Sequence, residues 1–90
     1  MRRAARRDEN EPVIVAALRG AGWTAEPVSS PGFPDLVIAK GRTVRLMEIK
    51  AAGGSITSAQ ISFRQRWRGP PILTSTNAHE AIALAEEAAR

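Results

Sequence analysis

The first clear hydrophobic pattern follows a polar start of the chain. Its apolar residues recur at helical spacing, so they would share one face of a helix: Ile14, Val15, Leu18 and Ala21. Asn10 suits the N-cap position, and Pro12 fits a first helical turn because an N–H there would have no partner within the helix. Gly20 and Gly22 interrupt the pattern. The sequence therefore predicts an amphipathic helix from Asn10 to Gly20.

Short runs rich in aliphatic and β-branched residues occupy the middle of the chain. Residues 23–28 form a weak strand pattern that leads into Ser29-Ser30-Pro31-Gly32. Residues 35–39 and 44–50 form two stronger patterns on either side of Lys40-Gly41-Arg42-Thr43. A two-residue turn with Gly41 first and a four-residue loop over 40–43 are both compatible with this spacing. Either connection pairs Ala39 with Val44, so the predicted hairpin has a single register.

The second half of the chain alternates helix and strand signals. Ala51-Ala52-Gly53-Gly54 breaks the strand pattern, and Thr57 with Gln60 forms a capping box that opens a helix reaching about Arg68. Gly69-Pro70-Pro71 ends it, and residues 72–74 form a short strand. Asn77 then caps a last helix through Ala89. The predicted order is αβββαβα, an α/β domain around a small mixed sheet.

The length and composition suit one small domain, which we place at residues 10–90. The absence of cysteine excludes thiolate metal sites and disulfides and fits a reducing cytoplasm. The apolar run from Pro12 to Leu18 is too short to cross a membrane, so no membrane association is expected. The net charge of +4 is due to Arg2, Arg3, Arg6 and Arg7, because the other charges balance. We expect residues 1–9 to form a flexible basic arm, either simply solvated or in contact with phosphates.

The hairpin register places Asp35 directly opposite Glu48. Facing residues of an antiparallel pair have Cβ atoms about 4.5–5.5 Å apart, where like charges destabilise the sheet. A divalent cation between the carboxylates would reverse the sign of this interaction, and Mg²⁺ prefers such oxygen ligands. Strand alternation puts Lys50 on the same face. The alternative is that Asp35 starts a strand after Pro34, with Glu48 and Lys50 on a solvated face.

Pro34-Asp35, followed after twelve residues by Glu48-Ile49-Lys50, resembles the PD-(D/E)XK nuclease motif. The chain is more narrowly similar to stand-alone VRR-NUC domains of viruses and bacteria, relatives of Holliday-junction resolvases. The matching segments run along nearly the whole chain: Asn10-Glu11-Pro12, Gly32-Phe33-Pro34-Asp35, Gly41-Arg42-Thr43, Glu48-Ile49-Lys50, Gln60 and Trp67-Arg68-Gly69. This resemblance implies a compact, restriction-endonuclease-like fold.

The resemblance also implies a hydrolase that needs Mg²⁺ or Mn²⁺ and leaves 5′-phosphate and 3′-hydroxyl ends. Asp35, Glu48, Glu11 and the backbone carbonyl of Ile49 would bind the metal, and Lys50 would position the attacking water. Gln60 would orient water, Lys50 or a phosphate. Two of these residues have competing structural interpretations. Glu11 is also an acid favoured in a first helical turn, and Gln60 is also a member of a capping box.

By analogy with these relatives, we expect a homodimer that cuts branched DNA such as four-way junctions, in a bacterial or phage-infected cytoplasm. Besides the N-terminal arginines, we consider Lys40, Arg42 and Arg64 as DNA contacts, although each is also an ordinary surface charge. Two alternatives remain: a less selective phage nuclease, and a catalytically silent DNA- or protein-binding module. No Walker-type loop, zinc-ligand spacing or nucleophile–histidine pair competes, and no organic cofactor is expected.

Overall fold

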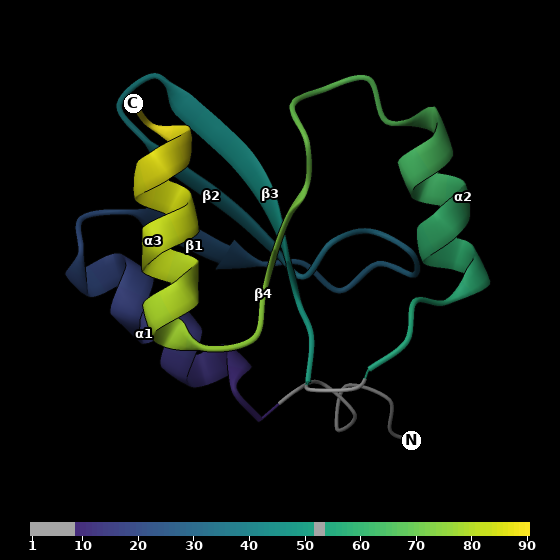
Figure 1. Cartoon of the computed structure of the whole chain (residues 1–90), viewed down its shortest axis with the longest axis horizontal. Coiled ribbons are helices and arrows are strands. Elements are labelled where there is room, and N and C mark those ends of the chain that lie inside the picture. The colour runs from purple at the N-terminus through teal and green to yellow at the C-terminus, as the bar shows by residue number, and fades with distance from the viewer. Residues whose placement is uncertain (1–8, 52–53) are drawn as a thin grey trace.

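The fold is described from a computed structural model, which defines residues 9–51 and 54–90. These residues form three helices and a four-stranded mixed sheet in the predicted order (Figure 1). The elements are α1 (Glu11–Gly20), β1 (Thr24–Pro27), β2 (Leu36–Lys40), β3 (Thr43–Ile49), α2 (Ser58–Arg66), β4 (Leu73–Ser75) and α3 (Ala78–Ala88). Within the described ranges, no helix has the length and apolarity needed to cross a membrane.

The sheet has the strand order β1-β2-β3-β4, with antiparallel pairing up to β3 and a parallel pairing of β3 with β4. Ala39 pairs with Val44, which confirms the predicted register. Lys40 pairs with Thr43, so the connection is the two-residue turn of Gly41 and Arg42. Gly41 has φ +61° and Arg42 has no positive φ. This combination is the type II′ pattern, and it explains why glycine stands first in the turn.

Helices α1 and α3 cover one face of the sheet (Figure 1). Strand alternation sends every second side chain of β2 and β3 into this layer. The core consists of Ile14, Val15, Leu18, Trp23, Ala25, Leu36, Ile38, Met47, Ile49, Ala81 and Ala85. The small alanines of α3 let that helix approach the sheet and α1 closely. Residues of β3 that alternate with Met47 and Ile49, including Glu48, therefore belong to the opposite face.

Helix α2 lies on the opposite side of the sheet from α1 and α3 (Figure 1) and has no fully buried residue. Aromatic side chains attach this helix to the loop before β2. The ring of Phe63 is 5.0 Å from that of Phe33, in the loop before β2, and stacks at 5.6 Å on Trp67. Gly32, with φ +82°, approaches α2 so closely that a Cβ there would be 2.6 Å from the carbonyl oxygen of Ala59. The loop that leads to Asp35 is thus packed directly against α2.

Three local predictions need correction. Asn10 occupies the N-cap position of α1 but has helical φ −72° and ψ −19°, so its side chain does not cap the helix and instead donates to the carbonyl of Thr76. Helix α2 ends at Arg66 rather than near Arg68, because Trp67 is extended (ψ 127°) and its indole N–H donates to the carbonyl of Pro70. Strand boundaries shift by one residue or so, and β2 begins at Leu36 rather than Asp35.

The contact of Gly32 with α2 gives a direct test of how α2 is attached. We expect Gly32→Ala to lower the free energy of unfolding by about 2 kcal/mol or more, because it adds backbone strain to a steric clash. Gly41→Ala is the matched control. It has the same strain at φ +61° but open space around the new Cβ, so it should cost only about 1 kcal/mol. Urea unfolding measures both, and equal losses would contradict the described docking.

Candidate functional site

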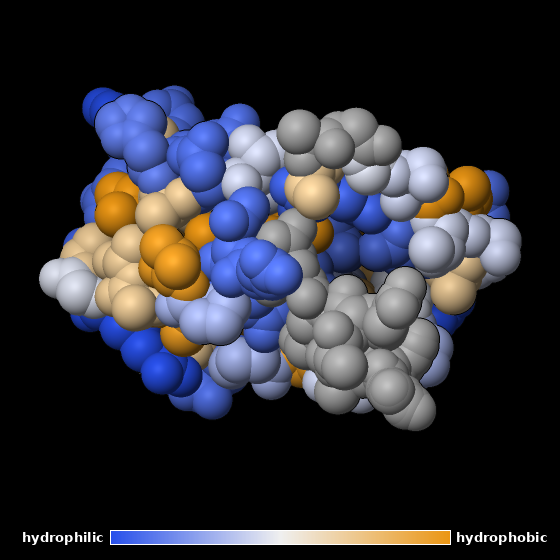
Figure 2. Space-filling model, turned by 90° about the horizontal axis from the view of Figure 1, so that it is seen from below, coloured by the Kyte–Doolittle hydropathy of each residue, from blue (hydrophilic) through white to orange (hydrophobic). Residues whose placement is uncertain are grey.

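The candidate residues gather where β3 and β4 end, on the side of the molecule from which all three helices begin (Figure 1). The backbone N–H of Lys50 donates to the carbonyl of Ser75 at 2.9 Å, and Asn10 holds the next residue, Thr76. The start of α1 is therefore fixed at the same end of the sheet as Lys50. Viewed from this side, hydrophilic atoms occupy the region between the α1 and α3 half of the molecule on the left and α2 on the right (Figure 2).

Asp35 and Glu48 face each other, as predicted. Leu36 pairs with Met47, and one residue further along each strand Asp35 lies opposite Glu48. The carboxyl groups of these two residues are hydrogen-bonded to each other. Asp35 Oδ2 also accepts a 2.8 Å bond from the backbone N–H of Ile49. Glu48 is only 3% exposed. Two acids thus lie against each other on a largely desolvated part of the sheet.

This arrangement raises the pKa of Glu48 from its ordinary value of 4.5 to about 8. Burial is the largest cause, followed by the hydrogen bond that protonated Glu48 donates to the carboxylate of Asp35 and by the negative charge of Asp35. The positive charges of Lys50 and Arg64 act in the opposite direction, but they do not cancel the rise. Near neutral pH the metal-free pair therefore holds one proton, which forms the hydrogen bond between the two carboxyl groups.

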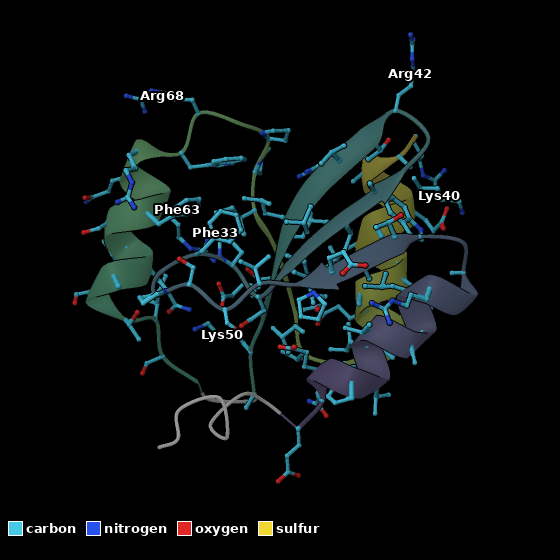
Figure 3. All side chains as sticks on the ribbon, turned by 180° about the vertical axis from the view of Figure 1, so that it is seen from behind. Phe33, Lys40, Arg42, Lys50, Phe63 and Arg68 are labelled. Atoms are coloured by element: carbon cyan, nitrogen blue, oxygen red, sulfur yellow. The ribbon has the colours of Figure 1, made fainter. Side chains whose placement is uncertain are left out.

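Lys50, labelled in Figure 3, and its hydrogen-bond partner Gln60 complete the cluster. Lys50 Nζ donates to Gln60 Oε1 at 3.1 Å and to the carbonyl of Ser55 at 3.1 Å. Gln60 Nε2 donates to Glu48 Oε2 at 2.8 Å. The same Gln60 Oε1 accepts from the N–H of Thr57 at 2.8 Å, closing the capping box of α2. Both interpretations of Gln60 are therefore compatible with one geometry, in which the helix cap aims the amide at the acidic pair.

The donor set suits a hard divalent cation. Asp35 and Glu48 supply carboxylate oxygens on adjacent strands, and a cation there would replace the shared proton. Glu11 is buried at the start of α1, at the same end of the sheet. However, among residues 9–51 and 54–90 no three acidic or histidine side chains gather closely enough to hold a metal ion. Glu11 thus does not join Asp35 and Glu48 in this conformation.

The candidate DNA contacts fall into three groups. Arg2, Arg3, Arg6 and Arg7 lie outside the described residues. Lys40 and Arg42 lie at the far end of the hairpin from Lys50 (Figure 3). At a rise of about 3.3 Å per residue, Arg42 is about 20 Å along β3 from Glu48. Lys40 donates to Glu86 and to the carbonyl of Ala21, which indicates a structural role. Arg64, on α2, is the described candidate whose charge acts on Glu48.

Two features of the site had no counterpart in the sequence prediction. Phe33 packs against α2 through Phe63 and thereby links the Pro34-Asp35 segment to the helix that holds Gln60 (Figure 3). The Asp35–Ile49 hydrogen bond fixes the rotamer of the first acid. The aromatic residue directly before Pro34-Asp35 was the available signal for the first feature. The second depends on side-chain geometry that spacing alone does not define.

A comparison of the chain with known protein families, curated proteins and solved structures found no match. Its function must therefore be inferred from its own residues and their geometry.

The raised pKa of Glu48 predicts how the stability of the metal-free protein depends on pH. The unfolded chain releases this proton near pH 4.5, whereas the folded chain holds it to about pH 8. The folded state binds more protons between these values, so the free energy of unfolding should fall as pH rises through this window and level off above it. Glu48→Gln should lose this decline in chelator-treated urea titrations. Parallel curves for the two proteins would contradict the protonated pair.

Proposed function

We propose that the chain is a divalent-metal-dependent DNA nuclease of the PD-(D/E)XK type, similar to stand-alone VRR-NUC domains. The main observation in its favour is the facing pair Asp35 and Glu48, with Lys50 bound to the same glutamine as Glu48. A chain selected for stability alone would avoid a buried acid in contact with a second acid. The contact between Asp35 and Glu48 becomes favourable if a divalent cation takes the place of the proton that they share.

Asp35, Glu48 and the backbone carbonyl of Ile49 are the proposed metal ligands. The carboxylate of Asp35 already accepts a hydrogen bond from the backbone N–H of Ile49. This bond fixes the Asp35 side chain relative to the backbone of Ile49. Glu11 is kept as a further ligand that would act directly or through water. When bound, Mg²⁺ or Mn²⁺ would supply Lewis acidity that stabilises the charge developing on the phosphate oxygens.

Lys50 orients the attacking water, and Gln60 positions Lys50 and Glu48. Lys50 donates an N–H to the oxygen of the attacking water and so aligns it with the phosphorus. Gln60 holds Lys50 and Glu48 at 3.1 Å and 2.8 Å, which limits the motion of both groups. Water oxygen bonds to phosphorus as the bond to the 3′-oxygen breaks. The water loses a proton and the 3′-oxygen gains one, leaving 5′-phosphate and 3′-hydroxyl ends.

Branched DNA is the proposed substrate and a homodimer the proposed assembly, both by analogy with the similar domains. A chain of 90 residues has a thin core, and pairing with a second copy would increase its buried area. The four arginines within the first seven residues are suited to contacts with phosphates outside the cutting site. A bacterial or phage-infected cytoplasm is the compartment that this activity implies.

A cleavage assay tests the proposal. Labelled four-way junction, flap and linear duplex DNA are incubated with Mg²⁺, Mn²⁺ or chelator. We expect cutting only with metal, and a loss of at least about 100-fold in Glu48→Ala and in Lys50→Ala, because each removes a group that acts on the transition state. Glu87→Ala, which changes an exposed acid paired with Arg90, is the charge-matched control and should cut normally.

The binding behaviour of the same proteins decides between enzyme and binding module. Retained DNA affinity in the two inactive variants would show that the loss is chemical. Binding without cutting in either metal by the unaltered chain would refute the nuclease and support a silent DNA-binding module.

A further inference from the structure

Arg64 occupies a defined position above the acidic pair. It lies one helical turn after Gln60 on α2, and residues at this spacing share a helix face. That face is oriented by the bonds of Gln60 to Glu48 and Lys50 and by the contact of Phe63 with Phe33. The positive charge of Arg64 is close enough to lower the pKa of Glu48, against the larger effect of burial.

Arg64 as a residue is half-buried, yet its guanidinium makes no hydrogen bond or ion pair with any residue in the described part of the chain. Several other arginines already have partners within the protein. Arg19 donates to the carbonyl of Ala25, Arg45 to that of Pro71, and Arg66 lies 5.4 Å from the centre of the Phe63 ring. Arg64 is thus a cation on the helix face that carries Gln60, near enough for its charge to act on Glu48, with its donors available for an external anion.

The charge of the proposed site supports the same conclusion. Ionised Asp35 and Glu48 would offset one divalent cation. Glu11, as a further ligand, would add one negative charge, and Lys50 and Arg64 supply two positive ones. A phosphodiester carries one negative charge, and a second develops as water adds to phosphorus. Lys50 donates to the carbonyl of Ser55 and to Gln60, and its third N–H is assigned to the attacking water. Of these two cations, Arg64 is therefore the one with free donors for a non-bridging oxygen.

We propose that Arg64 is a catalytic residue that binds the phosphate being cut and stabilises the charge of its transition state. This inference rests on the proposed nuclease function and assigns Arg64 a role different from a general DNA contact. A general contact would strengthen DNA binding without changing the rate at saturating protein. A transition-state contact would change that rate with little effect on binding.

The test compares Arg64→Gln with Arg66→Gln, which makes the same change of charge two residues away on α2. Single-turnover cleavage is measured at saturating protein with Mn²⁺, and DNA affinity is measured separately with Ca²⁺. We expect Arg64→Gln to cut roughly 100-fold more slowly with an affinity loss below about threefold, and Arg66→Gln to behave as the unaltered chain. Arg64→Lys should recover part of the rate. Thermal unfolding and circular dichroism establish that the variants fold.

Each other outcome has a definite meaning. If the unaltered chain cuts and Arg64→Gln cuts equally fast, this proposal fails and the nuclease stands. If only DNA affinity falls, Arg64 is a ground-state contact and the proposal is again wrong. If Arg64→Gln does not fold, Arg64→Lys decides: cutting slower than that of the unaltered chain at unchanged DNA affinity supports the proposal, and cutting at the full rate overturns it. If the unaltered chain cuts nothing, the proposed function and this inference both fall.

Discussion

The contact between the carboxyl groups of Asp35 and Glu48 is the constraint on which the rest of the site depends. The hairpin register sets these acids opposite each other, and the burial of Glu48 limits how far water can screen their charges. In the metal-free protein a proton resolves the conflict, as the raised pKa of Glu48 shows. The surrounding cations and the amide of Gln60 favour the ionised form only in part. A cation with two charges would satisfy both carboxylates at once.

The two layers of the fold have different tasks in maintaining this contact. Helices α1 and α3 pack on one face of the sheet and stabilise the strands that bear the acids. Helix α2, on the other side, contributes Gln60 and Arg64 and is attached through Gly32, Phe33 and Phe63. The stable layer thus fixes the register, while a small aromatic cluster positions the polar groups that act on the acidic pair.

Local sequence signals were sufficient for the element order, the hairpin register and the caps at Thr57 and Asn77, because turn and cap chemistry depends on neighbouring residues. They were not sufficient for contacts between distant segments. Asn10 was expected to cap α1, but it bonds to Thr76, which is 66 residues away. Lys40 was a candidate DNA contact, but its partner Glu86 is 46 residues away. Periodicity identifies a packed face, yet it does not identify which segment covers that face.

The most direct test of the central claim is the position of a metal ion. Crystals soaked in Mn²⁺ should give an anomalous difference peak between Asp35 and Glu48, about 2 Å from an oxygen of each carboxylate, with their mutual hydrogen bond broken. A peak at this position would show that a cation replaces the shared proton. Crystals at pH 8 in which the two carboxyl groups stay hydrogen-bonded, with no anomalous peak between them, would contradict the account.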